Sequence, residues 1–198
     1  MCEHFESIQT QSKFVILMHP KEFKKVKNNT GYFTHRSLPN SELFMGIDFS
    51  EHKRINEIIA THESYILFPS KNAINLTYER PKTPSKKIAI FLIDSTWACA
   101  KKIFTQSTNL QKLTHMSFET TKESLYEIKE QPEAHFLSTI ESTLVVLELL
   151  KKWEIEEIEE KKIERFLNPF YAMIAYQKEL INNPKSHAVR FKKNRTTS

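Results

Sequence analysis

The chain has very little glycine, since only Gly31 and Gly46 occur among its 198 residues. A dinucleotide-binding G-x-G-x-x-G needs three glycines, and a Walker P-loop needs two at a fixed spacing before Lys-Ser/Thr. Two glycines 15 residues apart can form neither motif, and the glycine-rich loop of Rossmann-type methyltransferases is missing too. A nucleotide-like cofactor would have to be held without a glycine-rich loop.

Cysteine is also scarce. Cys2 and Cys99 cannot form a zinc site alone, and no pair of the eight histidines has H-x-x-x-H or zinc-finger spacing. We therefore expect no metal, no disulfide framework and a reducing compartment. The longest apolar runs are far shorter than the roughly 20 residues that cross a bilayer, and residues 1–6 do not resemble a signal peptide. The sequence predicts a soluble, cytoplasmic protein with no membrane partner.

Charge is concentrated in two basic segments. The net charge is +5, and the segment 185–198 alone carries Lys185, Arg190, Lys192, Lys193 and Arg195 without an acid. A second cluster contains Lys21, Lys24, Lys25, Lys27 and Arg36, opposed only by Glu22. Such clusters suit a phosphate backbone, although a solvated tail and a solvated loop explain them equally well. The acidic run over 154–160 is interpreted as the exposed face of a helix.

Uninterrupted apolar runs predict buried strands over 14–18, 43–45, 65–68 and 88–93. Runs without polar alternation belong to sheets that are covered on both faces, and such sheets are usually parallel. Segments 51–60 and 96–105 have helical character between these strands. We therefore expect an α/β fold, with a mostly parallel sheet and helices on both faces.

After about residue 137 the pattern becomes helical. Ser138 and Glu141 have capping-box spacing ahead of an apolar run, and Asn168-Pro169 is a favourable helix start. The acidic segment between them is predicted to be helical as well. We expect an α/β domain over 1–153, a helical extension of the same domain over 154–184, and a flexible basic tail over 185–198.

The segment Asp94-Ser95-Thr96-Trp97 stands where the most apolar strand ends. Open α/β sheets bind ligands beyond the carboxyl ends of their strands, so a carboxylate, two hydroxyls and an indole at this point form a candidate site. The alternative is structural: Asp94 or Ser95 caps the following helix, and Trp97 packs in the core.

Further segments accompany this one in a fixed order, and together they resemble the DTW-domain proteins, which are tRNA-uridine aminocarboxypropyltransferases. The segments are His19-Pro20-Lys21-Glu22, Asn29-Thr30-Gly31, Leu38-Pro39-Asn40, Leu67-Phe68-Pro69-Ser70, Asp94-Ser95-Thr96-Trp97 with Ala100-Lys101, and Ser138-Thr139-Ile140-Glu141. The resemblance covers about residues 14–150. Tyr126-x-Ile128-Lys129 is similar to the family's tyrosine-and-arginine element.

The sequence departs from the family pattern at several positions. Of the cysteines that often precede the first strand only Cys2 is present, and Ser95 stands where glycine is common. Ala98 and Lys129 occupy positions where arginine is usual, which removes bidentate contacts to RNA or carboxylate groups.

The resemblance implies a SPOUT-like, knotted α/β domain that binds S-adenosylmethionine in a bent form. It implies transfer of the 3-amino-3-carboxypropyl group to N3 of a loop uridine in tRNA, with release of methylthioadenosine. Two alternatives stay open: a SPOUT-type RNA methyltransferase, and a non-catalytic RNA-binding protein on the same scaffold. The oligomeric state stays open too.

By the same resemblance, Asp94 is the base for N3 or the anchor of the donor's ammonium group. Partial burial beside Trp97 would make its carboxylate a stronger base. The implied catalytic residues are Asp94, Thr96 and Trp97. The implied cofactor-binding residues are Leu67, Phe68, Pro69, Ser70, Ile93, Ser95, Ser138 and Thr139. The implied RNA-binding residues are His19, Glu22, Lys24, Lys25, Asn29, Thr30, Lys129, Arg190, Lys192 and Lys193.

Overall fold

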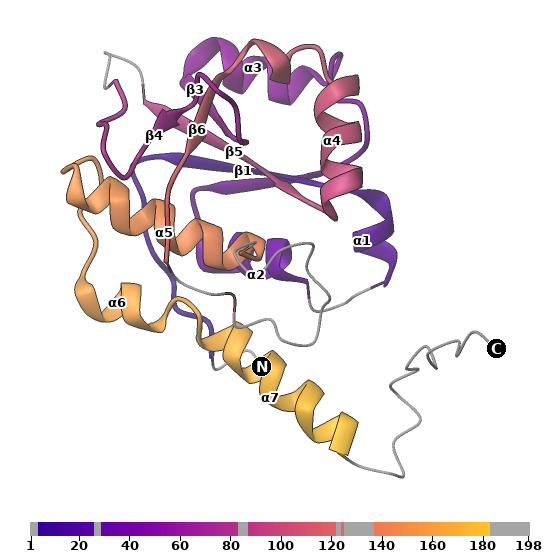
Figure 1. The fold of residues 1–198 in the computed structure, drawn as a ribbon, viewed down its shortest axis with the longest axis vertical. Coiled ribbons are helices and arrows are strands. Elements are labelled where there is room, and N and C mark those ends of the chain that lie inside the picture. The colour runs from indigo at the N-terminus through magenta and orange to yellow at the C-terminus, as the bar shows by residue number, and fades with distance from the viewer. Residues whose placement is uncertain (1–3, 26–28, 83–86, 122–123, 125–136, 183–198) are drawn as a thin grey trace.

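The structure, a computed structural model, describes residues 4–25, 29–82, 87–121, 124 and 137–182 (Figure 1). Six strands form one parallel sheet: β1 (Lys13–Met18), β2 (Ser41–Met45), β3 (Glu63–Leu67), β4 (Ile74–Asn75), β5 (Ile88–Asp94) and β6 (Thr114–Ser117). The helices are α1 (Pro20–Lys25), α2 (Thr30–Ser37), α3 (Lys53–Thr61), α4 (Trp97–Gln106), α5 (Thr139–Lys152), α6 (Glu160–Arg165) and α7 (Asn168–Asn182), with a 3-10 turn at Leu110–Lys112. The α/β fold with a parallel sheet is therefore confirmed.

The strand order is β2-β1-β5-β3-β6-β4, and every pair of neighbours is parallel. Strand β5 lies in the middle, with its last residue Asp94 in register with Met18 of β1. On its other side, Phe91 is in register with Ile66 of β3. The most apolar strand thus has neighbours on both edges and helices on both faces, as its sequence predicts.

Alternate residues of the central strands point into two separate cores. Phe14, Ile16, Ile90 and Leu92 belong to one core, which residues of α2, α5, α6 and α7 complete. The other core contains Val15, Leu17, Ala89 and Phe91 of the same two strands, together with residues of α3 and α4. Helices cover both faces (Figure 1), so this part of the prediction is confirmed as well. The knot that the resemblance implies stays a prediction.

The acidic segment after α5 differs from its prediction. Glu154 has a φ of 57°, and the chain leaves the helix there before α6 begins at Glu160. Glu156 is 4% exposed, and its carboxylate accepts hydrogen bonds from the backbone N–H groups of Gln11 (2.8 Å) and Ser12 (2.7 Å). The interpretation as an exposed helix face is therefore wrong for Glu156, which ties this segment to the residues just before β1.

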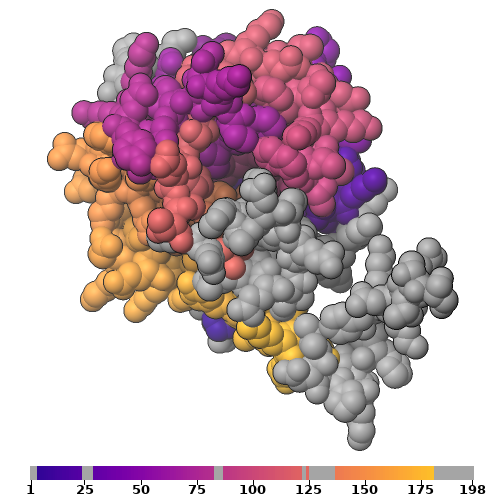
Figure 2. All heavy atoms as spheres, viewed as in Figure 1, coloured from indigo at the N-terminus to yellow at the C-terminus, as the bar shows by residue number. Residues whose placement is uncertain are grey.

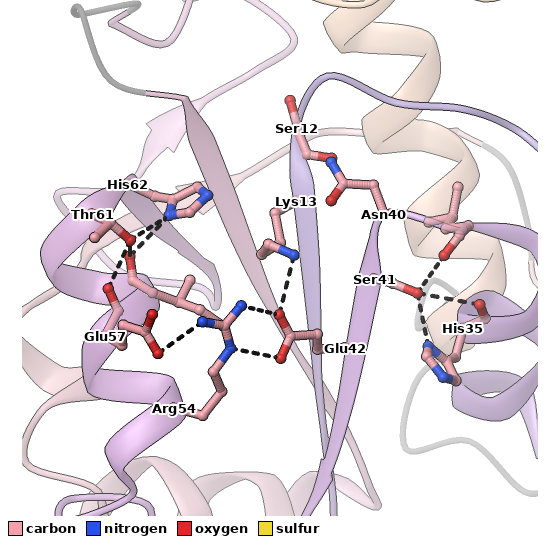
Figure 3. A network of polar contacts seen from close by, with 12 residues as sticks. Ser12, Lys13, His35, Asn40, Ser41, Glu42, Arg54, Glu57, Thr61 and His62 are labelled. Atoms are coloured by element: carbon pink, nitrogen blue, oxygen red, sulfur yellow. Dashed lines mark hydrogen bonds and ion pairs between the residues drawn. The ribbon is translucent and has the colours of Figure 1, made fainter.

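Glu42 on β2 is the centre of a charged network (Figure 3). It accepts two hydrogen bonds from the guanidinium of Arg54 (3.0 and 2.8 Å) and one from the ammonium of Lys13 (3.1 Å). The bonds from Arg54 above all lower the pKa of Glu42 from 4.5 to about 2, although its burial acts in the opposite direction. A lowered pKa in the folded state stabilises the fold above about pH 4.5, and this contribution is lost as the pH falls toward 2.

We expect the substitution Glu42→Gln to lower the free energy of unfolding at pH 7, because it removes the charge that Arg54 and Lys13 contact. The loss should be only about 1 kcal/mol, since solvent screens this half-buried network. Urea unfolding of both proteins from pH 7 to pH 2 should show the difference shrinking below pH 4.5. Glu57→Gln is the matched control, since the exposed carboxylate of Glu57 forms an ion pair with the same Arg54 and its loss should have a smaller effect. A constant difference across the pH range would contradict this assignment.

Candidate functional site

The candidate site lies at the carboxyl edge of the sheet, between β1 and β5. The chain leaves β1 toward β2 on one side and leaves β5 toward β6 on the other, so this is a point where the connections diverge. Ligands of open α/β sheets bind in crevices at such points. The two strand ends are joined here, because the N–H of His19 donates to the carbonyl of Asp94 (3.2 Å).

Asp94 is 5% exposed and is held by two helices from the same face of the sheet. The hydroxyl of Thr139, the first residue of α5, donates to Asp94 Oδ1 at 2.6 Å. Gly31 in the first turn of α2 packs directly on the carboxyl group, since a Cβ built on it would lie 2.5 Å from Asp94 Cγ and 2.6 Å from Oδ2. Only glycine leaves room for the carboxylate in this position. Three segments far apart in the chain therefore meet at Asp94.

Capping interactions fix where these two helices begin. Asn29 caps α2, because its Oδ1 accepts from the N–H of Tyr32 at 2.7 Å while its Nδ2 donates to Met18 Sδ at 3.3 Å. At the start of α5, the carboxylate of Glu141 accepts from the N–H (2.8 Å) and the hydroxyl (2.6 Å) of Ser138. The capping-box interpretation is confirmed, and it places Thr139 within reach of Asp94.

The two hydroxyl residues after Asp94 have different surroundings. Thr96 stands at the N-cap position of α4, and its carbonyl accepts from the N–H of Ala100 (2.8 Å), but its exposed side chain makes no capping bond. The alternative in which Asp94 or Ser95 caps this helix is therefore wrong. Within the described part of the chain, the buried Ser95 hydroxyl oxygen has no hydrogen-bond partner.

Trp97 belongs to an aromatic stack on the opposite face of the sheet. Its ring is stacked on Phe68 (centroids 5.4 Å apart, planes 14° apart), and Phe68 is stacked on Phe104 at 4.6 Å. His115 meets both phenylalanines edge-on, and the ammonium of Lys101 lies 5.4 Å from the centroid of Trp97. Phe68 and Phe104 pack against the α3–α4 core, whereas Asp94 faces α2 and α5. Asp94 is buried as expected, but its carboxylate packs against α2 and α5 and not against Trp97, because the motif divides between two faces.

The remaining predicted residues lie around the same edge. His19 is 4% exposed, and its Nδ1 accepts from the N–H of Lys21 (3.1 Å), so the proton of the neutral ring sits on Nε2. Thr30 is buried and Glu22 half-buried. At the end of β3, Leu67 is half-buried, and Pro69 and Ser70 are exposed; Ile93 is half-buried against the α3–α4 core.

Six predicted basic residues carry less structural information. Lys24 and Lys25 lie in α1. Lys129, Arg190, Lys192 and Lys193 are outside the described residues, as is the tail over 185–198. Among the residues that are described, no group of His, Cys, Asp and Glu gathers as a metal site, and no helix is long and apolar enough to span a membrane.

A buried carboxylate lies at the divergence point of a parallel α/β sheet, with a glycine and a hydroxyl converging on it, which is where proteins of the open α/β class have their ligand-binding crevices. The family model described as the DTW domain matches residues 1–178, and the chain therefore belongs to this family. A search of solved structures gives no significant match.

Three curated relatives carry the same name. The chain is 28% identical to tRNA-uridine aminocarboxypropyltransferase 2 of Macaca fascicularis over 166 residues, which are 82% of this chain and 53% of that protein. It is 28% identical to the protein of the same name from Mus musculus, over 86% of this chain and 56% of that one. The Drosophila melanogaster protein is 26% identical, over 84% of this chain and 64% of the relative. The chain thus spans between about half and two thirds of the length of these relatives.

Proposed function

We propose that the chain transfers the 3-amino-3-carboxypropyl group of S-adenosylmethionine to N3 of a loop uridine in tRNA and releases methylthioadenosine. The observation that carries this proposal is the Asp94 carboxylate, buried at the carboxyl edge and held by Thr139 and Gly31. Membership of the DTW domain family and the name of the curated relatives support it. If the same site bound RNA without catalysing the transfer, the chain would be an RNA-binding protein instead.

The donor supplies a carbon that is already activated by its bond to the sulfonium. The protein's main task is then orientation of the two reactants, which is worth several kcal/mol of the barrier. Residues of this edge fit a polar ligand: the buried Ser95 hydroxyl has no partner among the described residues, and the Thr96 side chain is exposed beside it. These two hydroxyls, with the backbone around Pro69 and Ser138, would hold the donor.

Asp94 takes part in the transfer in this proposal. N3 of uridine lies on the Watson–Crick edge, so the target base must be unpaired and turned out of its stack. The bond from N3 to carbon forms while the bond from carbon to sulfur breaks, and the N3 proton passes to the carboxylate of Asp94. A role as anchor of the donor's ammonium group is the competing assignment for the same carboxylate.

Trp97 has a positioning role in this proposal. Its stack on Phe68 joins the segment after β3 to the start of α4, and both segments would border the donor. The hydrogen bonds of Glu141 to Ser138 fix the start of α5 in the same way. Each of these contacts keeps a segment of the site in place without touching the reacting atoms.

Thr139 should affect turnover by holding the Asp94 carboxylate in position. The substitution Thr139→Val keeps the branched shape but removes the donor to Asp94 Oδ1, and we expect turnover to fall about tenfold, the equivalent of about 1.4 kcal/mol. Thr139→Ser restores the hydroxyl and should retain most of the activity. Methylthioadenosine release at saturating substrates measures both. Equal activity of the valine and serine variants would remove Thr139 from this role.

The proposed reaction is tested by incubating the protein with total tRNA and S-adenosylmethionine and analysing nucleosides and by-products by mass spectrometry. A uridine that gains the aminocarboxypropyl group, together with methylthioadenosine, supports the proposal. S-adenosylhomocysteine with a methylated nucleoside would show a methyltransferase instead. No product, and no shift of the melting temperature with S-adenosylmethionine, would leave the RNA-binding alternative.

A further inference from the structure

Three large apolar side chains are exposed where β1 ends. They are Phe23 of α1 (55% exposed), Tyr32 of α2 (40%) and Met45 at the end of β2 (49%). Large apolar side chains that gather at one place on a surface point to a partner, whereas scattered ones do not. We call Phe23, Tyr32 and Met45 the β1-edge surface.

Each of these residues is linked to Met18, by strand pairing, by a side-chain contact or by its nearness along the chain. Met45 is the register partner of Met18 in the parallel pair of β1 and β2. The amide of Asn29 donates to Met18 Sδ (3.3 Å), and the same side chain accepts from the N–H of Tyr32 (2.7 Å). Phe23 lies in α1, which begins two residues after Met18. Because Asp94 is the partner of Met18 on its other side, the β1-edge surface adjoins the candidate site.

Positive charge borders this surface. Helices α1 and α4 contain five lysines and one acid, Glu22. Lys21, Lys101 and Lys102 are exposed. Figure 2 shows the indigo surface of α1 adjoining the rose surface of α4. Asp48, beyond β2, is an exposed acid of this region, and its carboxylate accepts hydrogen bonds from Ser50.

Trp97 is a poor platform for an incoming base. Its ring is stacked on Phe68, and the ammonium of Lys101 lies over it. A base that stacked there would have to displace one of these contacts. The exposed rings of Phe23 and Tyr32 need no such displacement.

We infer that the β1-edge surface binds single-stranded loop nucleotides of the tRNA, with Phe23 and Tyr32 stacking on bases and with Lys21, Lys101 and Lys102 contacting phosphates. Aromatic side chains beside a positive surface are the usual means of binding single-stranded nucleic acid. The inference rests on the proposed function, because it assigns the surface to the nucleotides that flank the target uridine.

The test measures binding of a fluorescein-labelled short oligouridylate by anisotropy, without S-adenosylmethionine. Phe23→Ala and Tyr32→Ala should each raise the Kd at least about fivefold, the lower end for loss of one base stack. Tyr32→Phe keeps the ring and should bind like the unmodified protein. Tyr78→Ala is the matched control, since Tyr78 is 69% exposed and lies next to β4 at the opposite edge of the sheet.

Each outcome decides the inference. Weaker binding of the two alanine variants, with normal binding of Tyr32→Phe and Tyr78→Ala and unchanged melting temperatures, supports it. An unchanged Kd for both alanine variants overturns it, as does a similar loss in Tyr78→Ala. The assay needs no turnover, so the β1-edge surface can be supported even if tRNA yields no product, and product can form even if this surface fails the test.

Discussion

Asp94→Asn is expected to lower turnover by about a hundredfold or more while the protein stays folded. A positioned general base contributes about 10²- to 10⁴-fold, and an amide cannot accept the N3 proton. The amide oxygen can still accept the hydrogen bond that Thr139 donates, so the contact between β5 and α5 is kept. Methylthioadenosine release with tRNA and S-adenosylmethionine measures the loss, and the melting temperature checks the fold.

The same variant separates the two roles proposed for Asp94. If the carboxylate accepts the proton, kcat falls and the Kd for S-adenosylmethionine hardly changes. If it anchors the ammonium group, the Kd rises as well, because a charge-assisted hydrogen bond to the donor is lost. Near-normal turnover in Asp94→Asn would remove the carboxylate from the mechanism.

Gly31→Ala is expected to be nearly as damaging although it adds only one methyl group. The new Cβ would lie 2.5 Å from Asp94 Cγ, so either α2 or the carboxylate must move. Overpacking of this kind costs about 1–3 kcal/mol, and a displaced carboxylate should lower turnover by about a hundredfold. Urea unfolding and methylthioadenosine release measure the two effects on the same preparation.

Gly46→Ala is the control for the stability part of this prediction. Its Cβ would meet the ring of Phe49 at 2.8 Å, which is also overpacking but does not touch Asp94. We expect a comparable loss of stability with a much smaller loss of turnover. Equal losses of turnover in both variants would show that Gly31 acts through stability alone.

Sequence patterns predicted the central strands well and the outer elements poorly. Strands β1 and β5 are uninterrupted apolar runs because they are buried on both faces, and their observed ends differ from the prediction by one residue. Strand β6 reads THMS, and β4 has only two residues, so neither carries a hydrophobic pattern of its own. Helices α1 and α2 are short, and the capping by Asn29 that starts α2 becomes visible only in the structure.

The site was predictable as a place but not as a set of contacts. The position of Asp94 follows from the end of an apolar strand, whereas its bond to Thr139 joins residues 45 positions apart. Gly31 was part of a recognised segment, but its packing role depends on what faces it. Once α2 is known, Gly31 itself indicates a close approach, because glycine in a helix is unfavourable by about 1 kcal/mol and the chain has only two glycines.

The central position of β5 has a consequence for how the protein is made. Its partners β1 and β3 are synthesised earlier and do not pair with each other. The edge of each strand that faces β5 therefore stays unpaired until residues 88–94 have been made. Nascent chains that end before this point therefore expose unpaired apolar strand edges, which are prone to aggregate and to attract chaperones. Because the last residue of the same strand is Asp94, its carboxylate reaches its position beside β1 only after β5 has paired with the strands on both sides.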